Sequence, residues 1–253
     1  MDLAQPYYTG IPHHPAHPPF LYGLNKRHGD YVLPGGASSA SEGLALGAHT
    51  GTHIDALCHF SCCGKLFGGA DASAQSYPEG LKNHTVDTMA PILRRGVLLD
   101  IAGLMGVEVL PRDFVILPGH LDAAAARLGA DPVRSGDVVL IRTGWARFWD
   151  DAARFISQVQ SPGPGLEAAR WLSARRVFAA GSDTAPFEFT PSPEMAVHVH
   201  LLVESGIHII ECLNLEELAG TNAVEFLFVA TPLKIRGGTG SPVRPFAFLE
   251  NHG

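Results

Sequence analysis

Short apolar segments alternate with helical patterns along most of the chain, and this alternation constrains the fold more than any other feature. Helical patterns are expected over residues 121–128, 166–176, 194–204 and 215–219. Buried strands are expected over residues 96–101, 138–143, 177–180, 207–210 and 225–230. Strands that alternate with helices indicate an α/β protein with a mixed, partly parallel sheet. No internal repeat is present, so a single domain is expected.

The first 36 residues differ from the rest because they are rich in Pro, His and Gly. The prolines between residues 12 and 19 exclude a regular helix or a central strand there. We therefore predict an extended N-terminal arm over residues 1–36, followed by one domain over residues 37–253. The arm either follows the surface, covers a pocket or crosses to a second subunit.

Charge and hydropathy exclude several classes of partner. The net charge is −7 and no dense run of Lys or Arg occurs, so nucleic acid is not expected as a partner. No run of about 18 apolar residues is present that could span a membrane, and residues 1–10 lack the features of a secretory signal. Cys58, Cys62 and Cys63 are too crowded for a disulfide framework, which predicts a reducing, cytoplasmic setting.

The densest group of chemically active side chains is His49, His53, Asp55 and His59. Thr and Gly between the first two histidines are poor helix formers, so we expect an extended segment. Residues of one parity share a face of a strand, which would point His49, His53 and Asp55 the same way, with Gly51 leaving space between the imidazoles. Two imidazoles and a carboxylate suit Zn²⁺ or Mn²⁺ and leave positions open for water and substrate.

A second, weaker group lies between residues 198 and 211. His198 shares a helix face with apolar residues, where a histidine is more often part of the core than a ligand. Glu211 follows an apolar run, at the end of a strand where α/β proteins place ligands, and a buried Glu there needs a cation or a hydrogen-bond partner. His200 competes with His198, and the residues alone leave both open. Cys58, Cys62 and Cys63 lack a Cys-x-x-Cys pair, and we interpret them as structural or incidental thiols rather than a zinc site.

The segment His-Thr-Gly-Thr-His-Ile-Asp-Ala-Leu-Cys-His, residues 49–59, resembles the signature of the cyclase family of metal-dependent hydrolases. That family includes bacterial kynurenine formamidases and isatin hydrolases. Further segments that resemble the family are residues 136–145, 181–184, 198–202 with Gly206 and Glu211, and 237–245. The resemblance covers nearly the whole chain from about residue 40. It implies a swivelling β/β/α type of fold and a homodimer or larger oligomer.

The resemblance also assigns roles to single residues. It implies that His49, His53 and Asp55 bind a metal and that His59 is catalytic. His198 and Glu211 match the ligands of a second ion in two-metal members, whereas isatin hydrolases use one manganese, so one or two ions of Mn²⁺ or Zn²⁺ are expected. One departure is Leu57, where formamidases typically have Pro, and it weakens a strict assignment as a formamidase.

These observations predict a metal-dependent hydrolase of a small aromatic amide or lactam. The metal would lower the pKa of a water molecule, and His59 would shuttle protons. Phe20, Tyr22 and Phe60, together with Tyr7 and Tyr8, are the candidates for apolar pocket walls around the substrate. A lactone hydrolase or true cyclase with the same site is an alternative, and a metal-binding module without catalysis is another. The second alternative is disfavoured because His59 is left over once the first ion has its ligands.

Overall fold

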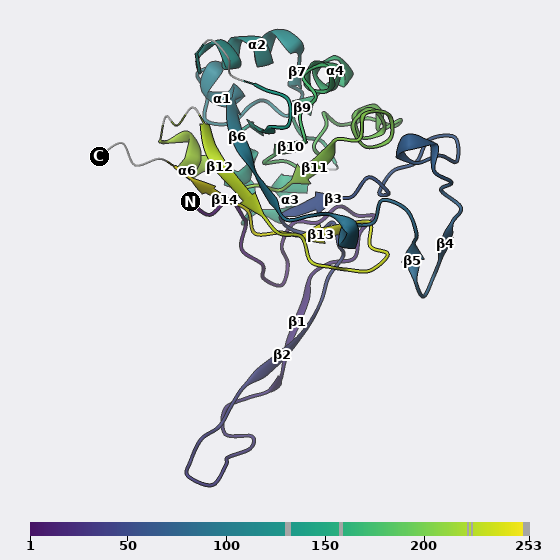
Figure 1. The fold of residues 1–253 in the computed structure, drawn as a ribbon. Helices are drawn as coiled ribbons and strands as arrows, with labels where there is room; N and C mark the ends of the chain where they lie inside the picture. The colour runs from purple at the N-terminus through teal and green to yellow at the C-terminus, as the bar shows by residue number, and fades with distance from the viewer. Residues whose placement is uncertain (130–132, 157–158, 222, 224, 250–253) are drawn as a thin grey trace.

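A computed structural model describes residues 1–129, 133–156, 159–221, 223 and 225–249 of the chain. Over these residues the main element is an eight-stranded mixed sheet (Figure 1). Its strands, in spatial order, are β13 (Gly240–Pro242), β3 (His53–Asp55), β11 (His208–Glu211), β10 (Ala179–Ser182), β8 (Val138–Arg142), β6 (Ile92–Asp100), β12 (Glu225–Ala230) and β14 (Phe246–Phe248). The four central strands β11, β10, β8 and β6 are parallel, and the outer strands are antiparallel. The mixed α/β fold expected from the sequence is confirmed.

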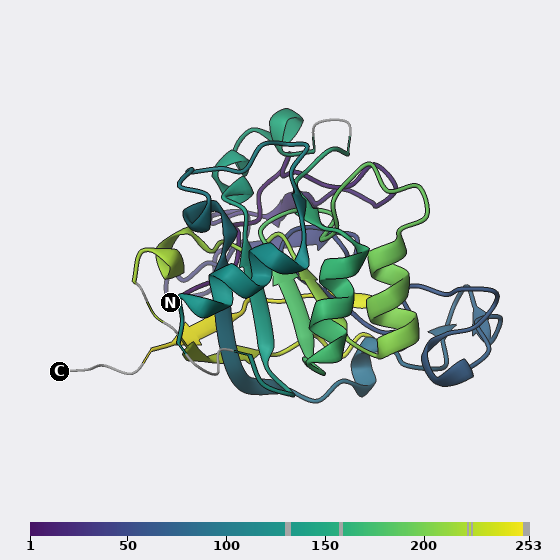
Figure 2. The same ribbon diagram turned by 90° about the horizontal axis from the view of Figure 1, so that it is seen from above.

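Helices α2 (Pro118–Ala126) and α4 (Leu166–Ala174) lie together on one face of this sheet (Figure 2), whereas Leu218 of α6 (Glu216–Ala219) packs into the core on the other face. The described helices are α1 (Ile101–Leu104), α2 (Pro118–Ala126), α3 (Ala152–Ile156), α4 (Leu166–Ala174), α5 (Ala196–His198) and α6 (Glu216–Ala219). Short 3₁₀ turns are η1 (Phe67–Gly69), η2 (Val86–Thr88) and η3 (Trp145–Phe148), and η4 (Val199–Ser205) is π-helical. The helix expected over residues 194–204 is thus divided between α5 and η4. It ends at Gly206, whose φ of 67° suits a residue without a side chain.

Both faces of the central strands are buried, which explains their uninterrupted apolar sequences. In β8, Val139 and Ile141 pack into the core under the helices. Val138 and Leu140 point to the opposite face, into a second core that includes Leu3 from the N-terminus. The first residues of the chain therefore cover part of the sheet. No described helix is long and apolar enough to cross a membrane.

Three small two-stranded sheets complete the fold: β1 (Leu21–Lys26) with β2 (Ser41–Ala45), β4 (Gln75–Ser76) with β5 (Gly80–Leu81), and β7 (Val115–Ile116) with β9 (Gly163–Pro164). The β1–β2 hairpin projects far from the body of the molecule (Figure 1). Residue 36, the boundary expected for the N-terminal arm, lies in the loop between these two strands. The first 20 residues instead run along the body.

Asp183 connects the ends of two central strands. It follows β10, and its buried carboxylate accepts hydrogen bonds from the backbone N–H groups of Thr143 and Gly144, at 2.9 and 2.8 Å, and from the Thr143 hydroxyl at 2.7 Å. The Asp183→Ala variant would leave two buried N–H groups without a partner. We expect its free energy of unfolding, measured by urea denaturation, to fall by about 2–5 kcal/mol.

The exposed Asp113 provides the control for this measurement, because the Asp113→Ala variant should stay within about 0.5 kcal/mol of the parent chain. Equal stabilities for the two variants would show that the Asp183 hydrogen bonds contribute little.

Candidate metal centre

The centre is built where β3 lies beside β11. The two strands are antiparallel, and His53 pairs directly with Glu211. The imidazole Nε2 of His53 lies 3.6 Å from Glu211 Oε2 and 3.5 Å from Asp55 Oδ1. Its other ring nitrogen, Nδ1, donates to the carbonyl oxygen of Gly51 at 2.8 Å. That hydrogen bond orients the ring and leaves Nε2 available to bind a cation.

His49 also reaches Asp55, although not as the alternation along an extended strand predicts. Strand β3 begins only at His53, and residues 49–52 form a turn and bend. His49 Nδ1 lies 2.7 Å from Asp55 Oδ1, and its Nε2 lies 2.9 Å from the hydroxyl of Thr239. The expected extended conformation of residues 49–52 was therefore wrong, because tertiary contacts fold this segment back on itself.

The interpretation of Gly51 is also corrected. Its φ is +73°, and a Cβ atom there would lie 2.4 Å from the ring of Tyr7. Gly51 therefore makes room for a side chain of the N-terminal arm, not for the space between two imidazoles. The Tyr7 hydroxyl lies 2.9 and 3.0 Å from the carbonyl oxygens of Thr50 and Thr52, to which it can donate.

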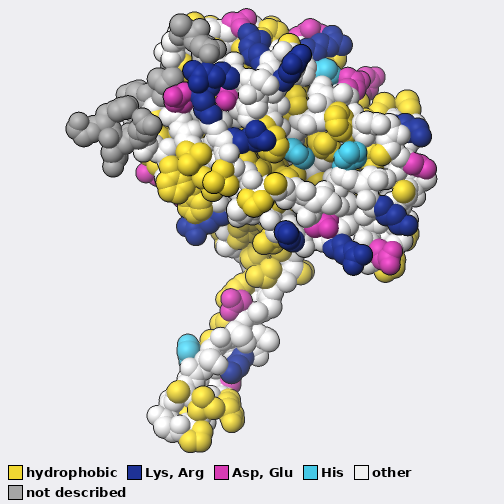
Figure 3. Space-filling model, viewed as in Figure 1, with side chains coloured by type: hydrophobic (Ala, Val, Ile, Leu, Met, Phe, Trp, Pro, Cys, Tyr) yellow, Lys and Arg dark blue, Asp and Glu magenta, His cyan; other side chains and the backbone are white. Residues whose placement is uncertain are grey.

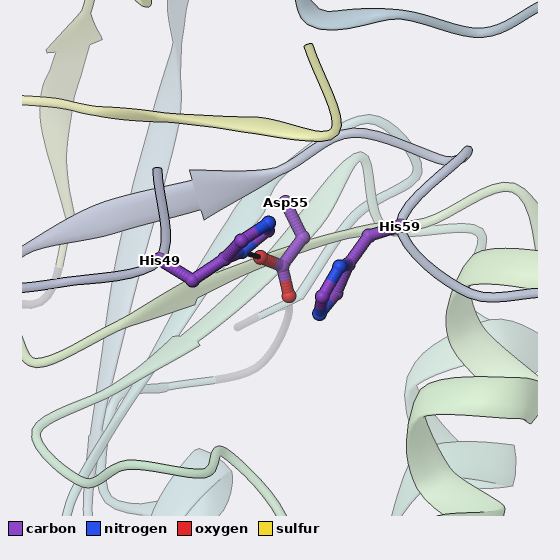
Figure 4. Close-up of side chains that lie close together, drawn as sticks. All are labelled: His49, Asp55 and His59. Atoms are coloured by element: carbon purple, nitrogen blue, oxygen red, sulfur yellow. Dashed lines mark hydrogen bonds and ion pairs between the residues drawn. The ribbon is translucent and has the colours of Figure 1, made fainter. Parts of the chain in front are cut away.

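His59 approaches Asp55 from the loop that follows β3. In Figure 4 the side chains of His49, Asp55 and His59 point toward one another, and each offers a ligand atom within 4.8 Å of the others. The rings of His49 and His59 are stacked with centroids 3.8 Å apart. No hydrogen bond joins the His59 ring to another described residue. Burial lowers the pKa of His59 to about 3, so this imidazole is neutral at pH 7.

His198 completes a second group with Asp55 and Glu211, whose ligand atoms also lie within 4.8 Å of one another. His198 Nε2 is 3.2 Å from Glu211 Oε1 and 3.9 Å from Asp55 Oδ2. Its Nδ1 lies 2.6 Å from a carboxylate oxygen of Glu188, a residue that the sequence did not single out. His200 lies outside the centre, where it contacts the hydroxyl of Ser173 at 2.8 Å and the carboxylate of Glu204 at 2.7 Å.

The buried charges of the centre fit a cation. Burial raises the pKa of Asp55, but the imidazoles of His59, His49 and His53 outweigh that effect and hold the pKa below its ordinary value. Although the carboxylate is buried, its Oδ2 has no hydrogen-bond partner among the described residues. A buried carboxylate oxygen without a partner is costly unless a cation meets it. Because Asp55 belongs to both groups, the donor set suits one divalent ion or two ions that share this carboxylate.

The centre opens onto a cavity of about 270 Å³. His49, His53, His59, His198 and Glu211 of the centre line it. The other lining residues are His14, Ala16, His17, Phe60, Ala185, Pro186 and Met195. Of the aromatic residues singled out in the sequence, Phe60 lines this cavity. Phe20 is only 8% exposed and packs in a separate cluster with Trp145, whereas Tyr22 is 51% exposed on the hairpin. Neither lines this cavity. Leu57 packs against the core beneath the helices.

Two groups of residues were missed from the sequence: two histidines that line the cavity, and Glu188, which contacts His198. His14 and His17 come from the N-terminal arm, whose histidines suggested only an unusual composition. Glu188 lies in a loop after β10, where its only signal is an acidic residue between two phenylalanines. The four cysteines are all unpaired, and none lines the cavity.

Comparison with known proteins agrees with this arrangement. The model of the Cyclase family matches residues 1–188, which is most of the chain. The chain belongs to the Cyclase family. Among its relatives in that family are an isatin hydrolase from Roseibium aggregatum, 25% identical over 217 residues, and a kynurenine formamidase from Bacillus cereus, 26% identical over 245 residues. The alignments cover 81% of this chain and 73% of the first relative, and 96% of this chain and 94% of the second.

Solved structures of the Cyclase family share the fold. The crystal structure of a novel cyclase has a TM-score of 0.90 and 28% identity, and the match covers 98% of this chain and 86% of the other. Isatin hydrolase A from Ralstonia solanacearum has a TM-score of 0.75 and 26% identity, with 99% and 91% of the two chains covered. The family predicted from the sequence is thus confirmed.

Proposed function

We propose that this chain is a metal-dependent hydrolase that cleaves a C–N bond of a small aromatic amide or lactam, of the kind found in isatin or N-formylkynurenine. The observation that carries the proposal is the carboxylate of Asp55, shared by two ligand groups whose other members, His49, His59, His198 and Glu211, line a cavity together with Phe60. Two relatives named for hydrolysis of such compounds, the isatin hydrolase and the kynurenine formamidase, support the same chemistry.

His49 and His53, whose ring nitrogens lie 2.7 and 3.5 Å from Asp55 Oδ1, would hold the first ion together with Asp55. Asp55, His198 and Glu211 would hold a second. A bound Mn²⁺ or Zn²⁺ supplies a water molecule of lowered pKa and a positive charge beside the carbonyl group that is attacked. Glu188 orients His198 through the hydrogen bond at Nδ1, so that Nε2 faces Asp55 and Glu211. Such partners fix the tautomer and orientation of a ligating histidine.

His59 is the residue that we assign to proton transfer. Its ring is neutral at pH 7, has no hydrogen-bond partner among the described residues, and is held by stacking on His49. It would accept a proton from the attacking water and then donate one to the leaving nitrogen. Phe60 lies 5.0 Å from the His59 ring, measured between centroids, and provides an apolar surface for the aromatic ring of a substrate.

The substrate class is tested by measuring hydrolysis of isatin and of N-formylkynurenine by metal-loaded protein, with an aromatic lactone as a third compound. The proposal expects turnover of at least one of the two amides. If the protein hydrolysed only the lactone, the proposed activity would be ester hydrolysis at the same centre and not amide hydrolysis.

The cytoplasmic location expected from the sequence stays a prediction.

We also propose that the chain forms a homodimer through the β1–β2 hairpin. Two-stranded hairpins are at best marginally stable alone in water, yet both strands of this one are exposed along nearly their whole length (Figure 3). Tyr22, Leu24 and Leu44 share one face of the hairpin and are 51%, 52% and 59% exposed. An exposed apolar surface of this kind is typical of a protein interface, and a second copy of the chain would bury it.

A double variant, Leu24→Glu with Leu44→Glu, should convert the dimer to a monomer, as measured by light scattering on a sizing column, because it places charge on the buried face. The Leu93→Glu variant is the control, since Leu93 is exposed on β6, outside the hairpin. A parent chain that elutes as a monomer, or a double variant that stays a dimer, would rule out this interface.

A further inference from the structure

The N-terminal arm forms part of the wall of the metal cavity, through His14, Ala16 and His17. The arm is fixed to the Thr-Gly-Thr segment between the two histidines of the signature. The hydroxyl of Thr50 donates to the carbonyl of Pro18 at 2.8 Å, and the hydroxyl of Thr52 accepts from the N–H of Gln5 at 2.8 Å. With Tyr7 packed over Gly51, these contacts hold the arm at both ends of residues 5–18.

His17 of the arm lies close to two of the histidines of the metal centre. Its ring centroid lies 5.1 Å from that of His49 and 6.1 Å from that of His59. No hydrogen bond joins either of its ring nitrogens to another described residue. A neutral imidazole carries one N–H donor and one acceptor, so His17 offers the cavity a polar group with no protein partner.

The neighbours of His17 fix where it can act. His14 packs against it, with centroids 5.5 Å apart, and the Nδ1 of His14 accepts from the N–H of Ala16 at 3.2 Å. Phe60 belongs to another part of the cavity wall, with its ring 4.9 Å from that of His198. Consider a substrate whose aromatic ring packs against Phe60 and whose scissile amide lies at Asp55. A further polar substituent on that ring can then point toward the imidazole of His17.

We propose that His17 positions the substrate by donating a hydrogen bond to a second carbonyl oxygen, next to the scissile amide. This inference rests on the proposed function and narrows its substrate class to aryl amides that carry a neighbouring ketone. Isatin has such a ketone beside the lactam carbonyl, and N-formylkynurenine has one ortho to the formamide. His17 acts on binding, because a hydrogen bond to a group that does not react is made equally in the ground and transition states.

The first test compares N-formylkynurenine with formanilide, which has the same formamide bond and no ketone. In the His17→Phe variant, kcat/KM for N-formylkynurenine should fall by about 10- to 100-fold, mainly through a higher KM, because a site built to hydrogen-bond a substrate loses that much when the bond is lost. The value for formanilide should change by less than about threefold. The His17→Gln variant keeps an N–H donor and should recover part of the loss.

The second test measures binding without turnover. Calorimetric titration of metal-loaded protein with 2-aminophenylglyoxylate and with 2-aminophenylacetate compares two ligands that differ only in the keto oxygen. The parent chain should prefer the glyoxylate, and the His17→Phe variant should lose that preference by about the same 10- to 100-fold factor. His13→Phe is the matched control, because His13 lies on the same arm but lines a different cavity.

The outcomes distinguish a failure of the role proposed for His17 from a failure of the proposed hydrolase function. Equal losses on both formamides, or an unchanged ligand preference, would overturn the role of His17 and leave the hydrolase intact. A parent chain that hydrolyses neither formamide nor isatin would overturn the proposed function, and this inference with it. Metal content and thermal unfolding of each variant show whether a loss comes from a damaged centre or an unfolded chain.

Discussion

The Asp55→Asn variant should lose its metal and its activity together. Asp55 is the one residue common to both ligand groups, and its Oδ2 has no hydrogen-bond partner among the described residues. Asparagine keeps the shape of the side chain but removes the negative charge that balances a cation. Changes of groups that only orient a ligand cost about 10- to 100-fold in metal affinity, so removal of the shared carboxylate should cost more than about 100-fold. Metal analysis and isatin turnover measure the two losses.

The Glu188→Gln variant is the control for this experiment, because a smaller loss of metal affinity is expected from it. Glu188 contacts the ring of His198 and is not a member of either ligand group. Its replacement should weaken metal binding by about 10- to 100-fold, clearly less than the effect at Asp55. If the Asp55→Asn variant kept a stoichiometric ion and normal turnover, the shared-carboxylate centre would be wrong.

The His59→Ala variant should lose turnover by about 10²- to 10⁴-fold while keeping most of its metal, because general acid–base catalysis usually contributes that much. The measurement has to include metal content, since His59 lies close enough to His49 and Asp55 to be a ligand itself. Loss of the ion along with turnover would make His59 a ligand, and unchanged turnover would remove it from the mechanism. His200→Ala is the control, because His200 contacts Ser173 and Glu204 outside the centre.

The central strands were predictable from the sequence because burial on both faces requires continuous apolar residues. Among them, β8 differs from its expected range by one residue. The outer strand expected over residues 225–230 also has these bounds in the structure, although it alternates between buried and more exposed residues. Strands β3 and β13 were not predictable in the same way. Each has only three residues: the site residues His53 and Asp55 occupy two positions of β3, and β13 is Gly-Ser-Pro. They join the sheet through pairing with β11 and with each other, which no local pattern encodes.

The prediction of the site shows the same division. The residues between His49 and His59 were singled out as candidates because ligand-type side chains crowd a short segment, but the local conformation was misjudged at Gly51. That error arose because the partner of Gly51 is Tyr7, more than forty positions away. Likewise, Glu188 and His17 reach the centre from distant loops without periodicity. The sequence left open whether His198 or His200 faces the centre. That depends on which side of α5 and η4 packs against the sheet, and a local sequence pattern does not encode it.

The most direct test of the metal-dependent hydrolase is a titration of metal-free protein with Mn²⁺ or Zn²⁺, followed by hydrolysis of isatin and of N-formylkynurenine. We predict that metal-free protein is inactive, and that turnover of at least one compound returns in proportion to bound ion, reaching its limit at one or two ions per chain. Full turnover by metal-free protein, or no turnover of either compound by protein that binds the ion stoichiometrically, would contradict this account.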